Sequence, residues 1–465
     1  MAVASLGAGS GVLTSTIIDQ LKAADSSAII TPITNKITLE QKRSSGLSLL
    51  NSLLTTFKAS VSALDDDSLY QKRSISGTTS SVTVTADTGV AVQSFSIANT
   101  TLATNNIKES GGFISSSSTV ATGTGTMKLT IGGATYNIDY TSSTTIDSLK
   151  ESINNTLGTS VKASILQVGS NDYRLVLNSG QTGADQAITI SDSTGGALNN
   201  ELLTYDAITN KTGIQDIQVS KDASFKYNGI TMTRSSNIIT DITPGMTINL
   251  LQDNGSANIV IAQDTTSISD SMSLFVSNYN ALTAQLTSMT TSDITAGTVG
   301  IFNGDNSINS ITREINQLVT SISSSGYSLP QFGIDLNETG TMSFNSSTFL
   351  KKFNTDPSAS EAFFSGKTTI DVNENGSFID GLFTSMNTLM DRYTNSSIGI
   401  MNALTTSSTA NIKALNDNKT RSQALLDARY NTMTARFVQY DTIMTKLTNQ
   451  FASLKSQINA YSSGN

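Results

Sequence analysis

The C-terminal end of the chain carries an apolar pattern that constrains the fold more than any other feature of the sequence. Large apolar residues recur at alternating spacings of four and three at Leu426, Tyr430, Met433, Phe437, Tyr440, Met444, Leu447, Phe451, Leu454, Ile458 and Tyr461. This spacing gives the a and d positions of about five heptads and is typical of a coiled coil. A helix over these residues would be about 50 Å long. Each buried side chain contributes roughly 1.5–3 kcal/mol, so the pattern predicts partner helices.

A second apolar stripe lies near the N-terminus, where residues 14–64 have helical periodicity. We expect Pro32 to end a first helix, because the residue before a proline avoids the α conformation. Thr31 and Pro32 then suit the N-cap and first position of a second helix. That helix has apolar residues at spacings of three and four, at Leu47, Leu50, Leu54, Phe57, Val61 and Leu64, and Asp65-Asp66-Asp67 ends the pattern.

The two stripes allow two interpretations. They could form an internal helix hairpin, in which each stripe covers the other. The C-terminal stripe, however, runs almost to the chain end, which favours contacts between subunits, or docking at both ends of the chain, over a central core. We therefore predict that both stripes form a self-assembly seam.

In the middle of the chain, between about residues 76 and 266, apolar and polar residues alternate with a period of two. Residues 81–85, 127–131 and 174–177 are examples, and they predict antiparallel strands with one solvated face. Thr145 to Leu157 predicts a single helix within this region. Ser115–Ser118, followed by a run of alternating Gly and Thr, predicts a flexible connector.

Residues 267–400 return to mixed helical patterns. Leu274, Tyr279, Leu282 and Leu286 are expected on one helical face, and Asp356-Pro357 has the residue types of an N-cap and first helical position.

The sequence therefore predicts an α+β multidomain fold, with coiled-coil terminal helices, a mixed helical domain, and antiparallel β domains inserted in the middle of the chain. The expected domains are residues 1–40 with 430–465 (terminal helices), 41–75 with 267–429 (helical and mixed), 76–105 with 214–266 (β), and 106–213 (an inserted β domain with one helix).

The composition excludes several classes of function. The chain has no His, Cys or Trp, so it has no thiol nucleophile, disulfide or imidazole base. Charged residues make up 14% and the net charge is -8, without a basic block for nucleic acid. The sequence has no run of 18 consecutive apolar residues, so we expect no membrane-spanning segment. The N-terminus has no Lys or Arg before Lys22 and no uninterrupted apolar run, so we do not expect a Sec signal peptide. We assign no catalytic, cofactor or metal residues and expect a protein that is not an enzyme.

Four short motifs have simpler explanations than ligand binding. Residues 7–11 (G-x-G-x-G) and 366–368 (G-K-T) depart from the phosphate-loop patterns. Residues 371–376 and 335–340 resemble the start of a calcium loop, but the twelfth position of the first is Leu382 instead of an acidic residue. We interpret these segments as turns.

Several segments, taken in order, resemble one known family. They are Ser5–Gly11, Phe225–Ile230 followed by Arg234–Asn237 and Asp241–Gly245, the F-x-x-x-Y-N-x-L helix at Phe275–Leu282, the turn at Gly333–Phe344, and residues 429–455. Residues 123–192, with Ile146, Leu149, Ile153-Asn154 and Tyr173–Leu177, are similar to a small β–α–β insert that flagellins share. Together these segments resemble the bacterial flagellar filament-capping family FliD, also called flagellar hook-associated protein 2.

The resemblance implies a homo-oligomeric ring, often a pentamer, at the distal tip of the flagellar filament. The terminal helices would be legs that point toward the filament. The ring would promote folding and insertion of exported flagellin and prevent its leakage. Its partners would be further copies of itself, flagellin, a hook–filament junction protein, and a cytoplasmic chaperone on the C-terminal helix. Secretion would use the flagellar type III export route.

Two alternatives stay open. The chain could be a flagellin or a hook–filament junction protein, although the Phe225–Gly245 and Gly333–Phe344 segments argue against it. The Ser/Thr-rich β insert also suggests a surface adhesin that would bind host glycans.

Overall fold

The computed structural model describes residues 14–194, 196–203, 213–293, 297–323, 326–370 and 376–462. The chain forms two compact units, Met1–Asp67 with Thr266–Asn465, and Ser68–Thr265. The second unit is inserted in the sequence of the first. The expected α+β fold, with long terminal helices and antiparallel sheets, is confirmed. The finer division into four domains stays a prediction.

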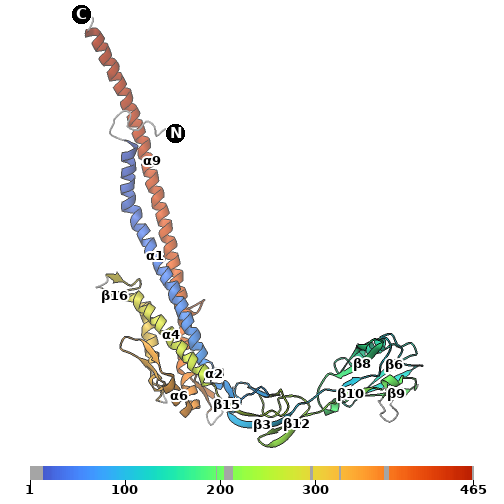
Figure 1. Ribbon diagram of the computed structural model, residues 1–465. Helices are drawn as coiled ribbons and strands as arrows, with labels where there is room; N and C mark the ends of the chain where they lie inside the picture. The colour runs from blue at the N-terminus through green and yellow to red at the C-terminus, as the bar shows by residue number, and fades with distance from the viewer. Residues whose placement is uncertain are drawn as a thin grey trace. The chain divides into compact units, whose positions relative to one another are not determined.

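Two long helices, α1 (Ser15–Asp65) and α9 (Ile400–Ser462), pack side by side in the first unit (Figure 1). The predicted break at Pro32 is wrong, because α1 continues through that residue. Ile30 and Ile37, on either side of the proline, are only 7% and 6% exposed. Burial of these side chains outweighs the local preference of the proline. The expected stop at Asp65-Asp66-Asp67 is confirmed, since α1 ends at Asp65.

The remainder of the first unit is a helical body with small hairpins. Its helices are α4 (Thr265–Thr290), α5 (Asn306–Val319), η3 (Leu329–Phe332), α6 (Ser346–Thr355), α7 (Pro357–Phe364) and α8 (Leu382–Thr394). Its hairpins are β16 (Ser292–Asp293) with β17 (Thr298–Val299), β18 (Ile334–Leu336) with β19 (Met342–Phe344), and β20 (Lys367–Ile370) with β21 (Gly376–Ile379).

Aromatic side chains pack the C-terminal half of α1 against this helical body. The ring of Phe57 on α1 lies 5.4 Å from that of Phe275 on α4, which lies 5.1 Å from that of Phe383 on α8. The predicted face of α4 is partly wrong, because Leu274 is 55% exposed and Phe275 takes its place. Phe275 lies four residues before Tyr279 and so continues the stripe with helical spacing. The expected cap of α7 is confirmed, since Asp356 accepts a hydrogen bond from Ala359 N at 3.0 Å.

The second unit begins with the short helix α2 (Asp67–Gln71) and is otherwise almost entirely β-structure. The part that flanks the insert in the sequence contains a five-stranded sheet in the order β1 (Arg73–Ser76), β15 (Ala257–Gln263), β3 (Gln93–Thr101), β11 (Ala223–Tyr227) and β12 (Ile230–Arg234). A three-stranded sheet has the order β13 (Ile238–Ile239), β14 (Met246–Leu250) and β2 (Val82–Ala86). One hydrophobic core, which includes Val84, Phe95 and Ile248, serves these sheets.

The inserted part has its own sheets and its own core. One sheet has the order β10 (Gln215–Gln218), β4 (Ile107–Glu109), β8 (Asp172–Ser179) and β7 (Val161–Gly169). The other has the order β6 (Ala134–Tyr140), β5 (Gly125–Ile131) and β9 (Thr189–Thr194), and the short helices η1 (Ala184–Gln186) and η2 (Asn200–Leu202) flank β9. β10, which lies in the range 214–266 that we assigned to the other β domain, pairs with β4 of the insert.

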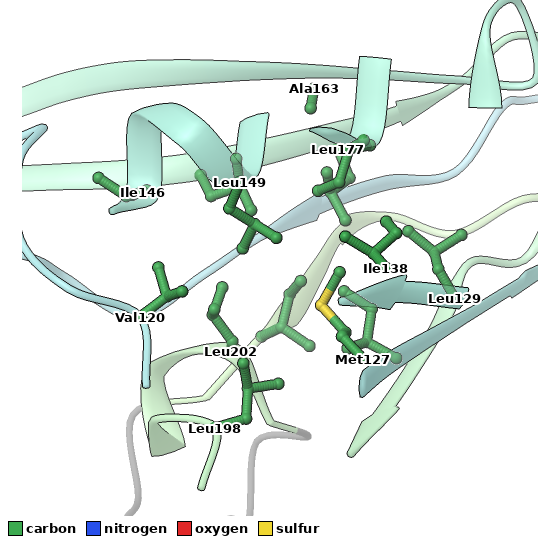
Figure 2. Packing of buried hydrophobic residues seen from close by; sticks show 14 of the residues in the cluster. Val120, Met127, Leu129, Ile138, Ile146, Leu149, Ala163, Leu177, Leu198 and Leu202 are labelled. Atoms are coloured by element: carbon green, nitrogen blue, oxygen red, sulfur yellow. The ribbon is translucent and has the colours of Figure 1, made fainter. Parts of the chain in front are cut away.

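The expected helix of the insert is confirmed as α3 (Ile146–Leu157), whose N-cap is Thr145. Figure 2 shows Ile146 and Leu149 of α3 together with Met127, Leu129 and Ile138 from the facing strands in one core.

The segment after Ser115, predicted as a flexible connector, packs against α3. Val120 is fully buried, and its amide donates to Thr144 O at 2.9 Å. The amide of Ile146 donates in turn to Ser118 O at 2.9 Å. The prediction is corrected because the run of small polar residues contains Val120 and Ala121, which anchor it in the core.

The short motifs that the structure describes are turns only in part, because Lys367 and Thr368 begin strand β20 and residues 335–336 end strand β18. Gly366 lies between the C-cap of α7, Ser365, and strand β20, with a φ of +87°. Residues 337–341 form the turn between β18 and β19, where Asn337 Oδ1 accepts hydrogen bonds from the amides of Thr339 and Thr341. Residues 7–11 and 371–375 lie outside the described residues.

Candidate assembly surface

The inner part of the C-terminal seam packs against α1. Leu426 and Tyr430 of α9 are 3% and 4% exposed, and they share a core with Ile18 and Ile30 of α1. Met433 and Phe437 pack against the same cluster and are partly buried. The two helices run antiparallel, and the start of α1 meets the middle of α9, which continues beyond it (Figure 1). This part of the seam is therefore the internal hairpin that the sequence left open.

Polar contacts flank this apolar cluster and fix the register of the two helices. Tyr430 OH donates to Asp25 Oδ2 at 2.9 Å, and Arg429 Nη1 lies 3.2 Å from the same oxygen. Burial, and then the hydrogen bond to Asp25, raise the pKa of Tyr430. Lys22 Nζ lies 2.8 Å from Asp427 Oδ1. The hydrogen bond from Lys22, followed by one from Gln423, lowers the pKa of Asp427.

The outer part of the seam has a different environment. Seven large apolar side chains, which we call the terminal stripe, are 44–64% exposed: Tyr440, Ile443, Met444, Leu447, Phe451, Leu454 and Ile458. No described residue of α1 covers them, since the described part of that helix begins at Ser15. The terminal stripe is thus an apolar helix face without a described partner, as a surface for another chain would be. The side chain of Tyr461 lies outside the described ones.

The N-terminal stripe is buried inside the chain itself. Leu47, Leu50, Leu54, Phe57, Val61 and Leu64 are 0–4% exposed. Their neighbours are the helices of the body, and Phe57 contacts both Phe275 and Tyr279. We therefore correct the prediction for these six residues, which belong to an intramolecular core. The physical reason is that α8, together with Phe275 and Tyr279 of α4, supplies the missing partner faces, which the periodicity of α1 alone cannot indicate.

Sequence reasoning missed two features of this surface. Ile443 lies one residue before a heptad position and widens the stripe, although its spacing is outside the 3-4 pattern. The polar contacts at Asp25 and Asp427 also went unnoticed. Asp427 and Arg429 flank seam positions, and charges beside a seam were the available signal for them.

Three motif asparagines have structural roles that the sequence did not indicate. In each, the side-chain amide bonds both the N–H and the C=O of one distant residue. Asn154 binds Ala163 in this way at 2.9 and 2.9 Å, Asn237 binds Ala103 at 2.7 and 2.9 Å, and Asn280 binds Met342 at 2.8 and 2.8 Å. These amide clamps satisfy backbone groups where the regular pairing ends.

The nearby motif residues also shape the β domain. Asn228 and Gly229 have φ values of +48° and +85°, as a two-residue hairpin between β11 and β12 requires. Arg234 Nε donates to both carboxylate oxygens of Asp241, at 2.9 and 2.8 Å.

Comparison with known families identifies the group of proteins that share these features. The model of the flagellar hook-associated protein 2 N-terminus matches residues 10–106, and that of its C-terminus matches residues 220–449. A third model, the flagellin hook IN motif, matches residues 126–181 within the insert.

The chain belongs to the flagellar hook-associated protein 2 (FliD) family.

Individual FliD relatives differ in how much of their length is shared. The flagellar hook-associated protein 2 of Campylobacter jejuni is 33% identical over an alignment of 430 positions, which covers 81% of this chain and 66% of the relative. That of Helicobacter pylori is 30% identical over 250 residues, and the match spans only 36% of the relative. That of Escherichia coli K12 is 27% identical over 98% of both chains.

A solved FliD structure has a similar fold. The crystal structure of the flagellar cap protein FliD D1-D2-D3 domains from Escherichia coli has a TM-score of 0.59 and 25% identity, and it covers 78% of this chain and 99% of that chain. The FliD resemblance that the sequence motifs indicate is therefore confirmed.

Within the described residues, no cluster of three or more acidic side chains is placed to hold a metal ion. No described helix is both long and apolar enough to cross a membrane.

Proposed function

We propose that this FliD-family protein is the cap of the flagellar filament. In this role it forms a homo-oligomeric ring at the distal tip, where exported flagellin folds and inserts without leaking away. The role is structural and involves no chemical reaction. Family membership and the similarity to the Escherichia coli cap protein support the proposal.

The observation that carries the proposal is the exposed terminal stripe on α9. Its seven side chains are about half exposed, so further burial of each would contribute roughly 1 kcal/mol, or about 7 kcal/mol in total before entropic costs. One helix face with this much apolar surface needs a cover in the assembled state. We propose that the cover comes from neighbouring legs of the ring or from the filament.

Further features of the role follow from the proposal. The ring contains several copies, with five as the family-based expectation. The chain leaves the cell through the flagellar export route, and a chaperone covers the terminal stripe before assembly. Flagellin and the hook–filament junction protein are the expected partners outside the cell.

The experiment introduces two carboxylates into the stripe with Leu447→Asp and Phe451→Asp. An unpaired charge in an apolar interface costs several kcal/mol even after relaxation. We expect cells with this variant to release unpolymerised flagellin into the medium. The melting transition of the purified protein's body should match wild type, because both side chains are 45% and 64% exposed within the chain.

The matched control is Asn449→Asp with Ser456→Asp. Both positions are exposed, lie on the opposite side of α9, and add the same charge to the same region. The control should support normal filaments, and electron microscopy of both purified proteins should show rings for the control only. Filaments of normal length with the Leu447→Asp, Phe451→Asp variant would contradict the proposal.

A further inference from the structure

A groove between α1 and α9 lies before the terminal stripe. It has a volume of about 210 Å³ and is lined by Ile29 of α1 and by Ser422, Leu425, Leu426 and Arg429 of α9. Leu425 is 68% and Ile29 42% exposed, so two large apolar side chains stand open on its walls. Both helices belong to the same compact unit.

The groove continues along one face of α9. A second hollow of about 590 Å³ follows, and its described lining residues, among them Thr432, Arg436 and Tyr440, all lie on α9. Leu425, Arg429, Thr432, Arg436 and Tyr440 are spaced by three or four residues, so they form a continuous line on the helix. Tyr440 is 62% exposed. The line is long enough to accommodate several turns of a third helix.

The charges in this line have one sign. Arg429 and Arg436 are seven residues apart, which is two helical turns or about 10.5 Å. The side chain of Arg429 is 63% exposed although it contacts Asp25, and no ion pair among the described residues includes Arg436. Arginine favours carboxylates because its planar fork of donors matches their geometry. A groove with exposed apolar residues beside two arginines is complementary to a helix that has an apolar stripe with acidic residues along its edge.

We infer that this groove binds an acidic amphipathic helix of a partner protein, with carboxylates seven residues apart. The groove shares only Tyr440 with the terminal stripe, and its occupant does not depend on the filament-cap role.

A second copy of the chain matches the groove poorly. From residue 407 to the end, the chain has seven basic and three acidic residues: Lys413, Lys419, Arg421, Arg429, Arg436, Lys446 and Lys455 against Asp417, Asp427 and Asp441. A leg from another copy would therefore bring positive charge to positive charge. Residues 1–13 of the chain contain no acidic residue, so they cannot neutralise the arginines either. Charge complementarity favours a different, acidic chain.

The test uses two synthetic helical peptides of three heptads as probes. Both have Leu at the a and d positions, and they carry either Glu or Lys at the flanking e and g positions. Binding to the full chain is measured by fluorescence anisotropy. We expect the Glu peptide to bind about tenfold more tightly than the Lys peptide at low salt, and the difference to shrink at about 1 M salt.

Variants locate the binding site. Arg436→Glu should abolish the preference for the Glu peptide. Lys446→Glu makes the same charge change about 80° around the helix and should leave the preference intact. The Leu447→Asp, Phe451→Asp variant should also keep it, which separates this inference from the capping proposal. Circular dichroism checks that all variants retain their helix content.

Three results would overturn the inference. The two peptides could bind equally, Arg436→Glu could keep the preference, or Lys446→Glu could remove it as well. A variant without residues 2–13 covers the remaining alternative. Binding of the Glu peptide to this variant and not to the full chain would mean that the chain's own N-terminus occupies the groove, and the inference would be wrong.

Discussion

The amide clamp of the inserted domain can be tested by a single substitution, Asn154→Ala. The side chain of Asn154, on α3, holds Ala163 on β7 through both backbone groups of that residue, at 2.9 Å each. Ala163 is 7% exposed, so water cannot easily replace the lost partner. The substitution removes the clamp and leaves the helix backbone unchanged.

The expected loss follows from the two backbone groups left without a partner. A buried donor or acceptor that loses its hydrogen bond costs about 1–3 kcal/mol, so the pair costs roughly 2–6 kcal/mol. Alanine regains about 0.5 kcal/mol through its higher helix propensity. For a domain of about 100 residues, even the smallest net loss in this range, about 1.5 kcal/mol, corresponds to a melting temperature lower by roughly 6–12 °C.

Differential scanning calorimetry of the full chain measures this change. The matched control is Asn155→Ala, because Asn155 is the next residue of α3, is exposed, and gains the same helix propensity. The control should melt at the wild-type temperature or slightly above it. Equal melting temperatures for Asn154→Ala and Asn155→Ala would refute the role of the clamp.

Three further outcomes are expected. Replacement of 105–220 by Asn-Gly should give a soluble, cooperatively melting protein, because Thr104 and Lys221 already exchange backbone hydrogen bonds of 3.0 and 3.2 Å, as the ends of a two-residue hairpin do; aggregation would show that the insert stabilises its neighbours. Pro32→Ala should stabilise α1 by about 1–3 kcal/mol in urea unfolding, since an exposed helical position regains its amide donor; an unchanged or lower stability would contradict this. The folded-state pKa of Asp427 is depressed, so the stability that this carboxylate contributes is present above its unfolded pKa of about 3.9 and is lost as the pH falls through its folded pKa. Thermal melts from pH 6 to pH 2 should therefore show a smaller acid destabilisation in Asp427→Asn than in wild type. Identical profiles would argue against the Lys22 contact.

The apolar periodicity of the sequence predicted the helices and strands that bury one face and expose the other to solvent. The helix at Thr145 to Leu157 and the strands at 127–131 and 174–177 follow directly from their apolar spacing, since one face is buried and the other solvated. The 3-4 spacing likewise predicted a helix over the whole length of the C-terminal seam, which lies within α9.

Features that depend on distant residues could not be read from the sequence. Pro32 is accommodated because α9 packs over its neighbour Ile30, and nothing near the proline indicates that contact. The division of the seam into a covered and an exposed part depends on where α1 begins, more than 400 residues earlier in the chain. The amide clamp of Asn237 joins residues 134 positions apart, so the motif was visible while its function was not.

The separation of contacting residues along the chain also has a kinetic consequence. The clamp of the insert joins residues 9 positions apart, that of the helical body joins residues 62 apart, and the Tyr430–Asp25 bond joins residues 405 apart. Local contacts close small loops and form quickly, whereas distant ones require nearly the whole chain. We expect the insert to fold first and the α1–α9 pair to form last, once both ends of the polypeptide are free to meet.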